Sequence, residues 1–154
     1  MKKKSLYIFD MDGTLFNTLG DLSVAVNYAL AEFGLKTLST EKIRSYIGNG
    51  SLKLIERSLE GADAPLEAVH RCYSEFYARH CQEATVPYPG VVDFLKNFPA
   101  KKALATNKPH IPGLALLRHF GIESCFDAFA FGDTVSKCKP AAEPFLKILG
   151  ETGI

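Results

Sequence analysis

Tryptophan is absent from the sequence, and neither sign of charge is in excess, because 18 Lys and Arg residues face 17 Asp and Glu residues. The formal net charge of +1 gives no field that would attract nucleic acid or a membrane surface, so neither partner is expected. Long apolar runs are also missing. The stretch behind Lys2-Lys3-Lys4 lasts only from Leu6 to Phe9, too short for a membrane span or a signal peptide. We therefore expect a cytoplasmic protein.

Cysteine is scarce, and its spacing excludes the common cysteine-based sites. The four cysteines form no C-x-x-C pair, and no histidine stands near them at the spacing of a zinc site. Reduced thiols and structural histidines are therefore expected. The cysteines are Cys72, Cys81, Cys125 and Cys138, and the histidines are His70, His80, His110 and His119.

The N-terminal segment is the most informative part of the chain. A short apolar run, Leu6 to Phe9, is typical of a buried strand and leads directly into Asp10 and Asp12. Side chains alternate along a strand, so these two acids point the same way while the chain stays extended. Crowded carboxylates repel each other, and they therefore favour a cation between them and a substrate. Gly13 permits a sharp turn, so the segment predicts chemistry at a strand end, where open α/β sheets bind ligands.

Two further motifs follow later strands. The sequence T-N-K-P at 106–109 ends an apolar strand predicted at 102–106, and K-P-A-A-E-P at 139–144 follows a strand predicted at 126–131. Together with D-x-D-G-T-L, these motifs resemble the haloacid dehalogenase-like superfamily of phosphotransferases, and within it the phosphoglycolate phosphatase-like branch. Ala142 departs from that pattern, in which a proline is common.

The resemblance also implies a fourth motif. In the family a further strand ends in Gly-Asp, and another acid follows to complete a magnesium site. Gly132-Asp133 is no substitute, because it precedes the lysine motif. We expect the chain to stop at Ile154 before that strand, which would leave three core strands and place the first strand at an edge.

Two regions of different periodicity divide the chain. Apolar residues recur at helical spacing between about 17 and 86, and helices are expected over 22–33, 40–48, 52–59 and 66–80. Beyond this region strands alternate with helices over 91–98 and 114–120, an order that predicts a parallel sheet. The expected fold is therefore α/β. It combines a Rossmann-like core, residues 1–16 and 87–154, with an inserted α-helical bundle that resembles the family's cap, residues 17–86.

The resemblance implies a role for each motif. Asp10 would be the nucleophile that forms an aspartyl-phosphate, and Asp12 the general acid and base. Mg²⁺ would bind the Asp10 carboxylate, the backbone carbonyl of Asp12 and a phosphate oxygen. Lys139 and Thr106 would stabilise charge on the phosphoryl oxygens. Lys137 is an alternative to Lys139, which is preferred because a proline follows it.

Substrate contacts are expected from the backbone N–H near Met11 and from Asn107 and Lys108 beside the second motif. The loop Gly48-Asn49-Gly50 resembles a cap loop that reaches over the site, and Arg44 would pair with a small carboxylate. The same loop is also a good turn between two helices, and Arg44 is equally consistent with a solvated surface charge.

Three functions remain open. A Mg²⁺-dependent phosphatase for a small phosphorylated metabolite, 2-phosphoglycolate foremost, is preferred. The second is a catalytically impaired fragment, at most a phosphate-binding module or one that self-associates through the exposed edge of the first strand. The third is a sugar phosphomutase, although no residue that would hold a hexose stands out in the cap.

Overall fold

The computed structural model describes residues 5–154. The strands are β1 (Leu6–Phe9), β2 (Phe16–Asn17), β3 (Val86–Pro87), β4 (Lys101–Ala105) and β5 (Ala128–Ala130). The helices are α1 (Leu19–Glu32), α2 (Thr40–Tyr46), α3 (Ser51–Ser58), α4 (Leu66–His80), α5 (Val91–Asn97), α6 (His110–His119), α7 (Glu143–Thr152) and the 3₁₀ helix η1 (Glu123–Cys125). Among these described elements, no helix combines the length and apolarity needed to span a bilayer.

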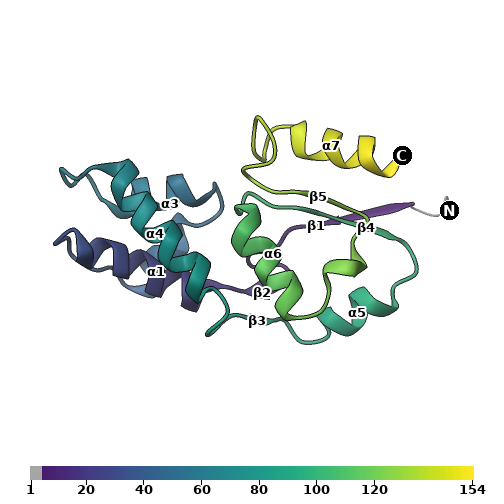
Figure 1. The fold of residues 1–154 in the computed structure, drawn as a ribbon, viewed down its shortest axis with the longest axis horizontal. Helices are drawn as coiled ribbons and strands as arrows, with labels where there is room; N and C mark the ends of the chain where they lie inside the picture. The colour runs from purple at the N-terminus through teal and green to yellow at the C-terminus, as the bar shows by residue number, and fades with distance from the viewer. Residues whose placement is uncertain (1–4) are drawn as a thin grey trace.

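The elements form a layered α/β region with a group of helices at one end (Figure 1). The sheet of β1, β4 and β5 lies between α7 on one side and α5 and α6 on the other. Helices α1, α3 and α4 lie together at the end of the molecule away from the C-terminus.

The sheet is parallel, with the order β1-β4-β5. Leu6 pairs with Lys101 in β4, and Ala103 of β4 pairs with Ala128 in β5. Parallel strands place their carboxyl ends at one edge, so the loops after β1, β4 and β5 meet there. The predicted strand–helix alternation is confirmed. Within residues 5–154, β1 is also an edge strand, as expected, and its side chains are only half-buried.

The two faces of the sheet are packed differently. Alanines of β4 and β5 form one face, where Ala103, Ala105 and Ala130 cluster with Ile148 of α7. Small side chains allow α7 to approach the strands closely. The other face carries large side chains, and Phe9 meets Phe94 of α5 with ring centroids 6.2 Å apart. Helices α5 and α6 on this face therefore pack against a thicker apolar layer than α7 does.

Helices α1–α4 follow β2 in the chain, precede β3, and pack mainly on one another. Helix α1 contacts α2 and α4, and α3 contacts α2 and α4. Strands β2 and β3 form an antiparallel pair, with Phe16 opposite Pro87 and Asn17 opposite Val86, so the chain leaves and re-enters the α/β region at one place. This pair lies at both boundaries of the predicted cap, although the division into 1–16 with 87–154 and 17–86 remains a prediction.

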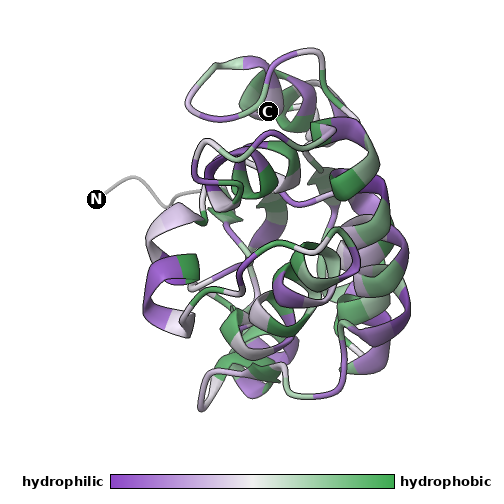
Figure 2. Ribbon diagram, turned by 90° about the vertical axis from the view of Figure 1, so that its left-hand side faces the viewer, coloured by the Kyte–Doolittle hydropathy of each residue, from purple (hydrophilic) through white to green (hydrophobic). Residues whose placement is uncertain are grey.

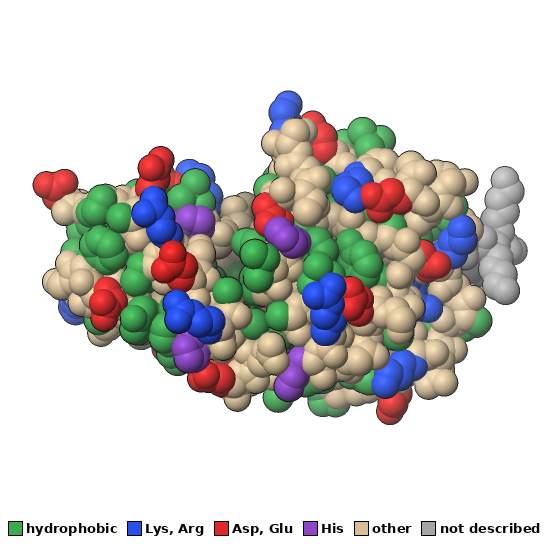
Figure 3. Space-filling view, in the orientation of Figure 1, with side chains coloured by type: hydrophobic (Ala, Val, Ile, Leu, Met, Phe, Trp, Pro, Cys, Tyr) green, Lys and Arg blue, Asp and Glu red, His purple; other side chains and the backbone are tan. Residues whose placement is uncertain are grey.

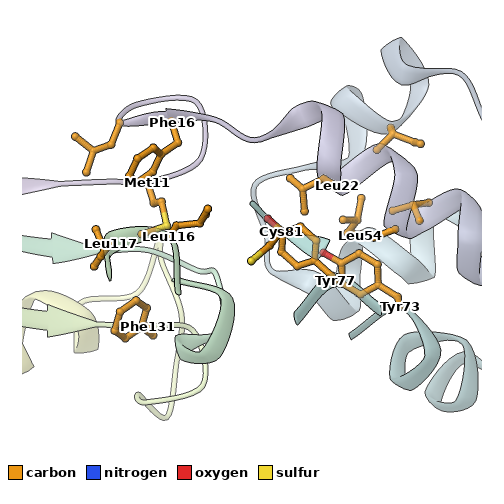
Figure 4. Close-up of a cluster of buried hydrophobic side chains, with 14 of the residues drawn as sticks. Met11, Phe16, Leu22, Leu54, Tyr73, Tyr77, Cys81, Leu116, Leu117 and Phe131 are labelled. Carbon is orange, nitrogen blue, oxygen red and sulfur yellow. The ribbon is translucent and has the colours of Figure 1, made fainter. Parts of the chain in front are cut away.

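Apolar side chains gather on both sides of this connection. The helices carry polar and apolar residues side by side, as amphipathic helices do (Figure 2). Figure 4 shows one group near the sheet and a second group between the helices of the predicted cap. The first group includes Met11, Phe16, Leu116, Leu117 and Phe131, and the second includes Leu22, Leu54, Tyr73, Tyr77 and Cys81.

Several predicted boundaries were wrong by a few residues. The strand predicted over 126–131 covers only Ala128–Ala130. It starts late because η1 precedes it, and it ends early because the Phe131 N–H donates a hydrogen bond to the Thr134 hydroxyl in a turn. The helix predicted over 114–120 begins four residues earlier, at His110, whose backbone N–H donates to Asp133 at 2.9 Å. That carboxylate satisfies an amide of the first turn, which has no partner inside the helix.

Candidate active site

Asp10 and Thr106 occupy equivalent places at the ends of neighbouring strands. Asp10 directly follows β1, and Thr106 directly follows β4. Both line a cavity of about 550 Å³, together with Asp12 and Lys108. Residues of α3 and α4 line its opposite side. The space-filling surface is indented between these helices and the α/β region (Figure 3).

The Asp10 carboxylate is held from two sides. Its Oδ1 accepts the backbone N–H of Met11 at 2.7 Å, and its Oδ2 lies 3.0 Å from Lys139 Nζ. The Met11 side chain is fully buried, and the Met11 carbonyl accepts three N–H groups of the turn that contains Gly13, at φ 76°. In this structure the Met11 N–H orients Asp10, and its contact with substrate remains a prediction.

Asp12 belongs to a chain of three polar groups, of which Lys108 and Tyr77 are buried. Lys108 Nζ lies 3.0 Å from Asp12 Oδ1 and donates to the Tyr77 hydroxyl at 2.7 Å. The Lys108 side chain is only 3% exposed, so this ammonium has little access to water. Burial raises the pKa of Tyr77 well above its ordinary value, and the nearby Asp12 charge adds to this. Tyr77 thus stays a neutral phenol whose hydroxyl anchors Lys108 to α4, and substrate contact by Lys108 remains a prediction.

Thr106 and Lys139 lie where the motif pattern places them. Thr106 is buried, and its hydroxyl oxygen accepts the Lys108 N–H at 3.2 Å, which leaves the hydroxyl proton available to another acceptor. Lys137 points elsewhere, since its side chain is 74% exposed and its nearest acid is Glu143 at 3.9 Å. Of the two candidate lysines, Lys139 is the one beside Asp10.

Asn107 connects three loops. Its Nδ2 donates to the carbonyls of Gly48 and Lys139, both at 3.0 Å, and its Oδ1 accepts the Lys139 N–H at 2.9 Å. An amide so engaged positions the lysine loop, and its contact with substrate remains a prediction. A Cβ on Gly132 would lie 2.2 Å from the Asn107 carbonyl oxygen, so this contact requires glycine.

The Gly48-Asn49-Gly50 loop reaches the cavity, as expected. Gly48 and Gly50 have φ values of 130° and 88°, which favour glycine, and all three residues line the cavity. Asn49 Oδ1 accepts from Arg57 of α3 at 2.9 Å, and the same guanidinium donates to the Tyr46 carbonyl at 3.1 Å. The loop is therefore held by a helix that sequence reasoning gave no role.

Arg44 is the predicted site residue that the structure does not bring to this cavity. It is exposed on α2 and lines a smaller hollow of about 390 Å³ beside Asp12, with Asn17, Thr18 and Tyr88. The physical reason is the direction of α2, whose buried residue is Ile43, so its neighbour turns outward.

Sequence reasoning missed Tyr77, Arg57 and His70. All three lie on helices of the predicted cap, and the first and last line the cavity. Tyr73 belongs to the apolar stripe of the helix predicted over 66–80, whereas Tyr77 lies outside it. Nothing in the helical pattern signals that the Tyr77 hydroxyl meets a lysine 31 residues further along. The sequence did contain one signal: His70 and Tyr77 are seven residues apart, which places them on the same face of a helix.

The donor set for a metal is small. Within residues 5–154, no group of three His, Cys, Asp or Glu side chains stands together in a way that would hold an ion. Asp10 and Asp12 both line the cavity, and the Asp10 carboxylate and the Asp12 backbone carbonyl are hard oxygen ligands. Mg²⁺ commonly takes one or two protein carboxylates and fills its other positions with water and phosphate oxygens, so these two residues fit that ion.

The fold and the site define an α/β protein that carries paired aspartates, a threonine and a lysine at the carboxyl edge of a parallel sheet. Residues 7–154 match the family model described as haloacid dehalogenase-like hydrolase. The phosphoglycolate phosphatase of Pasteurella multocida (strain Pm70) is 32% identical, across 100% of this chain and 74% of that protein. The chain therefore belongs to the haloacid dehalogenase-like hydrolases, in their phosphoglycolate phosphatase-like branch of phosphatases.

Solved structures agree with this assignment. The crystal structure of a predicted phosphoglycolate phosphatase from Haemophilus somnus 129pt superposes with a TM-score of 0.86 at 28% identity, covering 97% of this chain and 72% of that one. CbbY from Rhodobacter sphaeroides, crystallised in complex with phosphate, gives a TM-score of 0.82 at 27% identity, covering 97% and 73%. The α/β fold with its parallel sheet is thus shared with enzymes of this family.

Proposed function

We propose that this chain hydrolyses a small phosphomonoester through a phosphorylated Asp10. The observation that carries the proposal is the Asp10 carboxylate at the end of β1, held by the Met11 N–H at 2.7 Å and Lys139 at 3.0 Å beside the cavity. A carboxylate fixed in this way is oriented for attack on a ligand, and a positive charge lies where negative charge would develop.

Two steps follow from the arrangement. In the first, an Asp10 oxygen bonds to phosphorus while the phosphorus–oxygen bond to the leaving alcohol breaks, and Asp12 gives that alcohol a proton. In the second, water attacks the phosphoryl group, Asp12 takes the proton, and the bond to Asp10 breaks to release phosphate. Lys139 and Thr106 are the groups that would stabilise charge on the phosphoryl oxygens.

Mg²⁺ is the cofactor we propose, bound by the Asp10 carboxylate and the backbone carbonyl of Asp12, which leaves the Asp12 carboxyl for proton transfer. Both carboxylates already face lysines, Lys139 and Lys108, so each acid has a partner that keeps it oriented. When bound, the ion would supply further positive charge to the phosphoryl oxygens.

The substrate is proposed by analogy and by the cavity. The names of the relatives make 2-phosphoglycolate the first compound to test. The phosphate complex of CbbY supports a phosphate site in the same fold. In our proposal, residues 17–86 act as a cap whose Gly48–Gly50 loop borders the substrate, and Arg44 contacts a carboxylate only if that cap moves.

Self-association is a second proposal, favoured by one observation. In the described residues β1 pairs only with β4 and presents its other edge. An unpaired strand edge can add a strand from another chain.

The test of the phosphatase proposal is turnover of p-nitrophenyl phosphate and 2-phosphoglycolate with Mg²⁺ or EDTA. We expect Mg²⁺-dependent release of phosphate that Asp10→Asn abolishes. Asp93→Asn, which changes an exposed acid on α5, is the matched control and should leave turnover unchanged. Turnover that survives Asp10→Asn would contradict the nucleophile, and a folded chain without turnover would contradict the activity.

A further inference from the structure

Arg57 lies in the last turn of α3 but contacts the chain that precedes this helix. Its guanidinium donates to the Tyr46 carbonyl, in the last turn of α2, at 3.1 Å and to Asn49 Oδ1 at 2.9 Å. A carbonyl in the last turn of a helix has no partner inside that helix, and a cation is favourable there. One planar group, with its donors in a fixed fork, therefore holds both the end of α2 and the middle of the Gly48–Gly50 loop.

The Gly48–Gly50 loop needs such a restraint from outside. Gly48 and Gly50 have φ values of 130° and 88°, in a region that glycine enters freely, and neither has a side chain that could anchor the loop. Asn49 supplies the side chain between them. Because a planar peptide bond joins the Gly48 carbonyl to the Asn49 N–H, a fixed Asn49 also restricts the direction of that carbonyl.

The Gly48 carbonyl connects the loop to the α/β region, because it accepts Asn107 Nδ2 at 3.0 Å. The two backbones lie close together, since a Cβ on Gly50 would be 3.6 Å from the Asn107 carbonyl oxygen. The same Asn107 amide donates to the Lys139 carbonyl at 3.0 Å and accepts the Lys139 N–H at 2.9 Å. Lys139 Nζ in turn lies 3.0 Å from Asp10 Oδ2. A continuous series of contacts thus leads from α3 to the lysine of the site.

Other contacts join α2 and α3 without Arg57. The Tyr46 hydroxyl donates to Glu60 Oε1 at 2.7 Å. Ile43 of α2 and Ile55 of α3 are fully buried in one apolar cluster. Arg57 is only half-buried and does not line the cavity. Its removal should therefore loosen the Gly48–Gly50 loop and leave the helical region folded.

We propose that Arg57 is a positioning residue for the reaction. Through the Gly48–Gly50 loop and Asn107, it holds the backbone of Lys139. This role rests on the proposed function, in which Lys139 stabilises charge on the phosphoryl oxygens. Arg57 touches neither the substrate nor the reacting atoms, so its whole effect on the reaction passes through that lysine.

The first test is a double-mutant cycle, measured as turnover of p-nitrophenyl phosphate with Mg²⁺. Arg57→Ala should lower kcat about fivefold, the effect of about one net hydrogen bond, and should change KM by less than about twofold. Lys139→Ala should lower kcat more. When residue 139 is already alanine, Arg57→Ala should change kcat by less than about twofold, because the two residues act in series. A loss of about fivefold in both backgrounds would overturn the inference.

Two further variants and a control accompany the cycle. Asn49→Ala removes the acceptor and leaves the guanidinium, so it should lower kcat to a similar extent even if Arg57→Ala does not fold. Arg57→Lys keeps the charge without the planar fork, and its kcat should fall between those of the unmodified chain and Arg57→Ala. Arg79→Ala is the matched control, because this exposed arginine donates to the Glu75 carbonyl of its own helix at 3.2 Å. An equal loss in the control would contradict the role of Arg57.

The second test needs no turnover and decides the case in which Lys139→Ala is too slow to measure. Amide exchange followed by NMR should show the Lys139 N–H exchanging about fivefold faster in Arg57→Ala and in Asn49→Ala, because its acceptor on Asn107 is held less well. Exchange in β4 should not change. Unchanged exchange at Lys139, or equal acceleration in β4, would overturn the inference. If Lys139 responds but the unmodified chain releases no phosphate, the link from Arg57 to Lys139 stands and the proposed function is wrong.

Discussion

Tyr77 connects the predicted cap to the acid Asp12 through Lys108. Removing its hydroxyl in Tyr77→Phe leaves the Lys108 ammonium, 3% exposed, without one of its two partners. A hydrogen bond to a charged group contributes about 1.5–3 kcal/mol, so Asp12 should be held less well. We expect kcat to fall about tenfold or more while KM changes little, as steady-state kinetics can measure. Tyr28→Phe, at an exposed position on α1, should change neither constant. A loss confined to KM would contradict a positioning role.

Gly132 provides a second prediction at a single residue. Gly132→Ala would place a Cβ 2.2 Å from the Asn107 carbonyl oxygen, so the loop that positions Lys139 has to move. Overpacking of this kind typically costs about 1–3 kcal/mol. Gly150→Ala is the matched control, because no atom lies within 4 Å of its added Cβ on α7. Urea denaturation should show Gly132→Ala less stable and Gly150→Ala more stable by about 0.5–1 kcal/mol.

His70 makes stability depend on pH. Burial lowers its pKa in the folded state below the ordinary 6.5, so the unfolded chain takes up the proton first as the pH falls. Its contribution is present above pH 6.5 and is lost as the pH falls toward the folded pKa. We expect His70→Gln to lose less stability than the unmodified chain between pH 7.5 and pH 5, measured by urea denaturation. The same pH dependence in both chains would show that other groups carry it.

For single residues, motif chemistry and spacing predicted which side chains lie beside the cavity, but they did not predict which partners those side chains contact. Asp10, Asp12 and Thr106 line the cavity, and Lys139 meets Asp10, because each follows directly or closely on a strand end. Their partners could not be predicted. The pairing of Lys108 with Tyr77 depends on how α4 packs across the cavity, which no local pattern encodes.

Among the elements, long periodic helices were predicted well and short pieces were missed. The helix predicted over 66–80 agrees with α4, because its apolar stripe fixes one buried face. The two-residue strands β2 and β3 are too short to show alternation, so nothing in the sequence indicated that they pair. Their position is set by long-range contacts instead.

Asp21 stabilises this crossing between the helices and the α/β region. Its buried carboxylate accepts the N–H groups of Ala84 and Thr85 at 2.8 to 2.9 Å, just before β3. Asp21→Ala would leave these amides without a partner, at a cost of about 1–3 kcal/mol for each unsatisfied group. We expect a stability loss of about 2–4 kcal/mol in urea denaturation. Asp93→Ala, at an exposed position on α5, should cost less than about 0.5 kcal/mol. Equal losses in both variants would contradict this role for Asp21.

At the scale of the molecule that residues 5–154 describe, the cavity is lined by the α/β region and by helices α1, α3 and α4, and polar contacts join the two sides. Asn107 donates to the Gly48 carbonyl at 3.0 Å, and Lys108 donates to Tyr77 at 2.7 Å. Asn107 and Lys108 both belong to the loop that follows β4. This one loop therefore contacts the helical region and, through Asn107, also holds Lys139. Movement of the helices would therefore change the support of Lys108 and Lys139 together.

The free edge of β1 sets the expected behaviour of the chain in solution. Within the described residues β1 pairs only with β4, and its half-buried apolar side chains suit a strand that has a neighbour on each side. We expect sedimentation velocity to show association that grows with concentration. Amide exchange at Leu6–Phe9 should slow as the chain associates, because the new partner protects those N–H groups, whereas exchange in α7 should not change. A monomer at every concentration, or slowing in α7 alone, would rule out association through this edge.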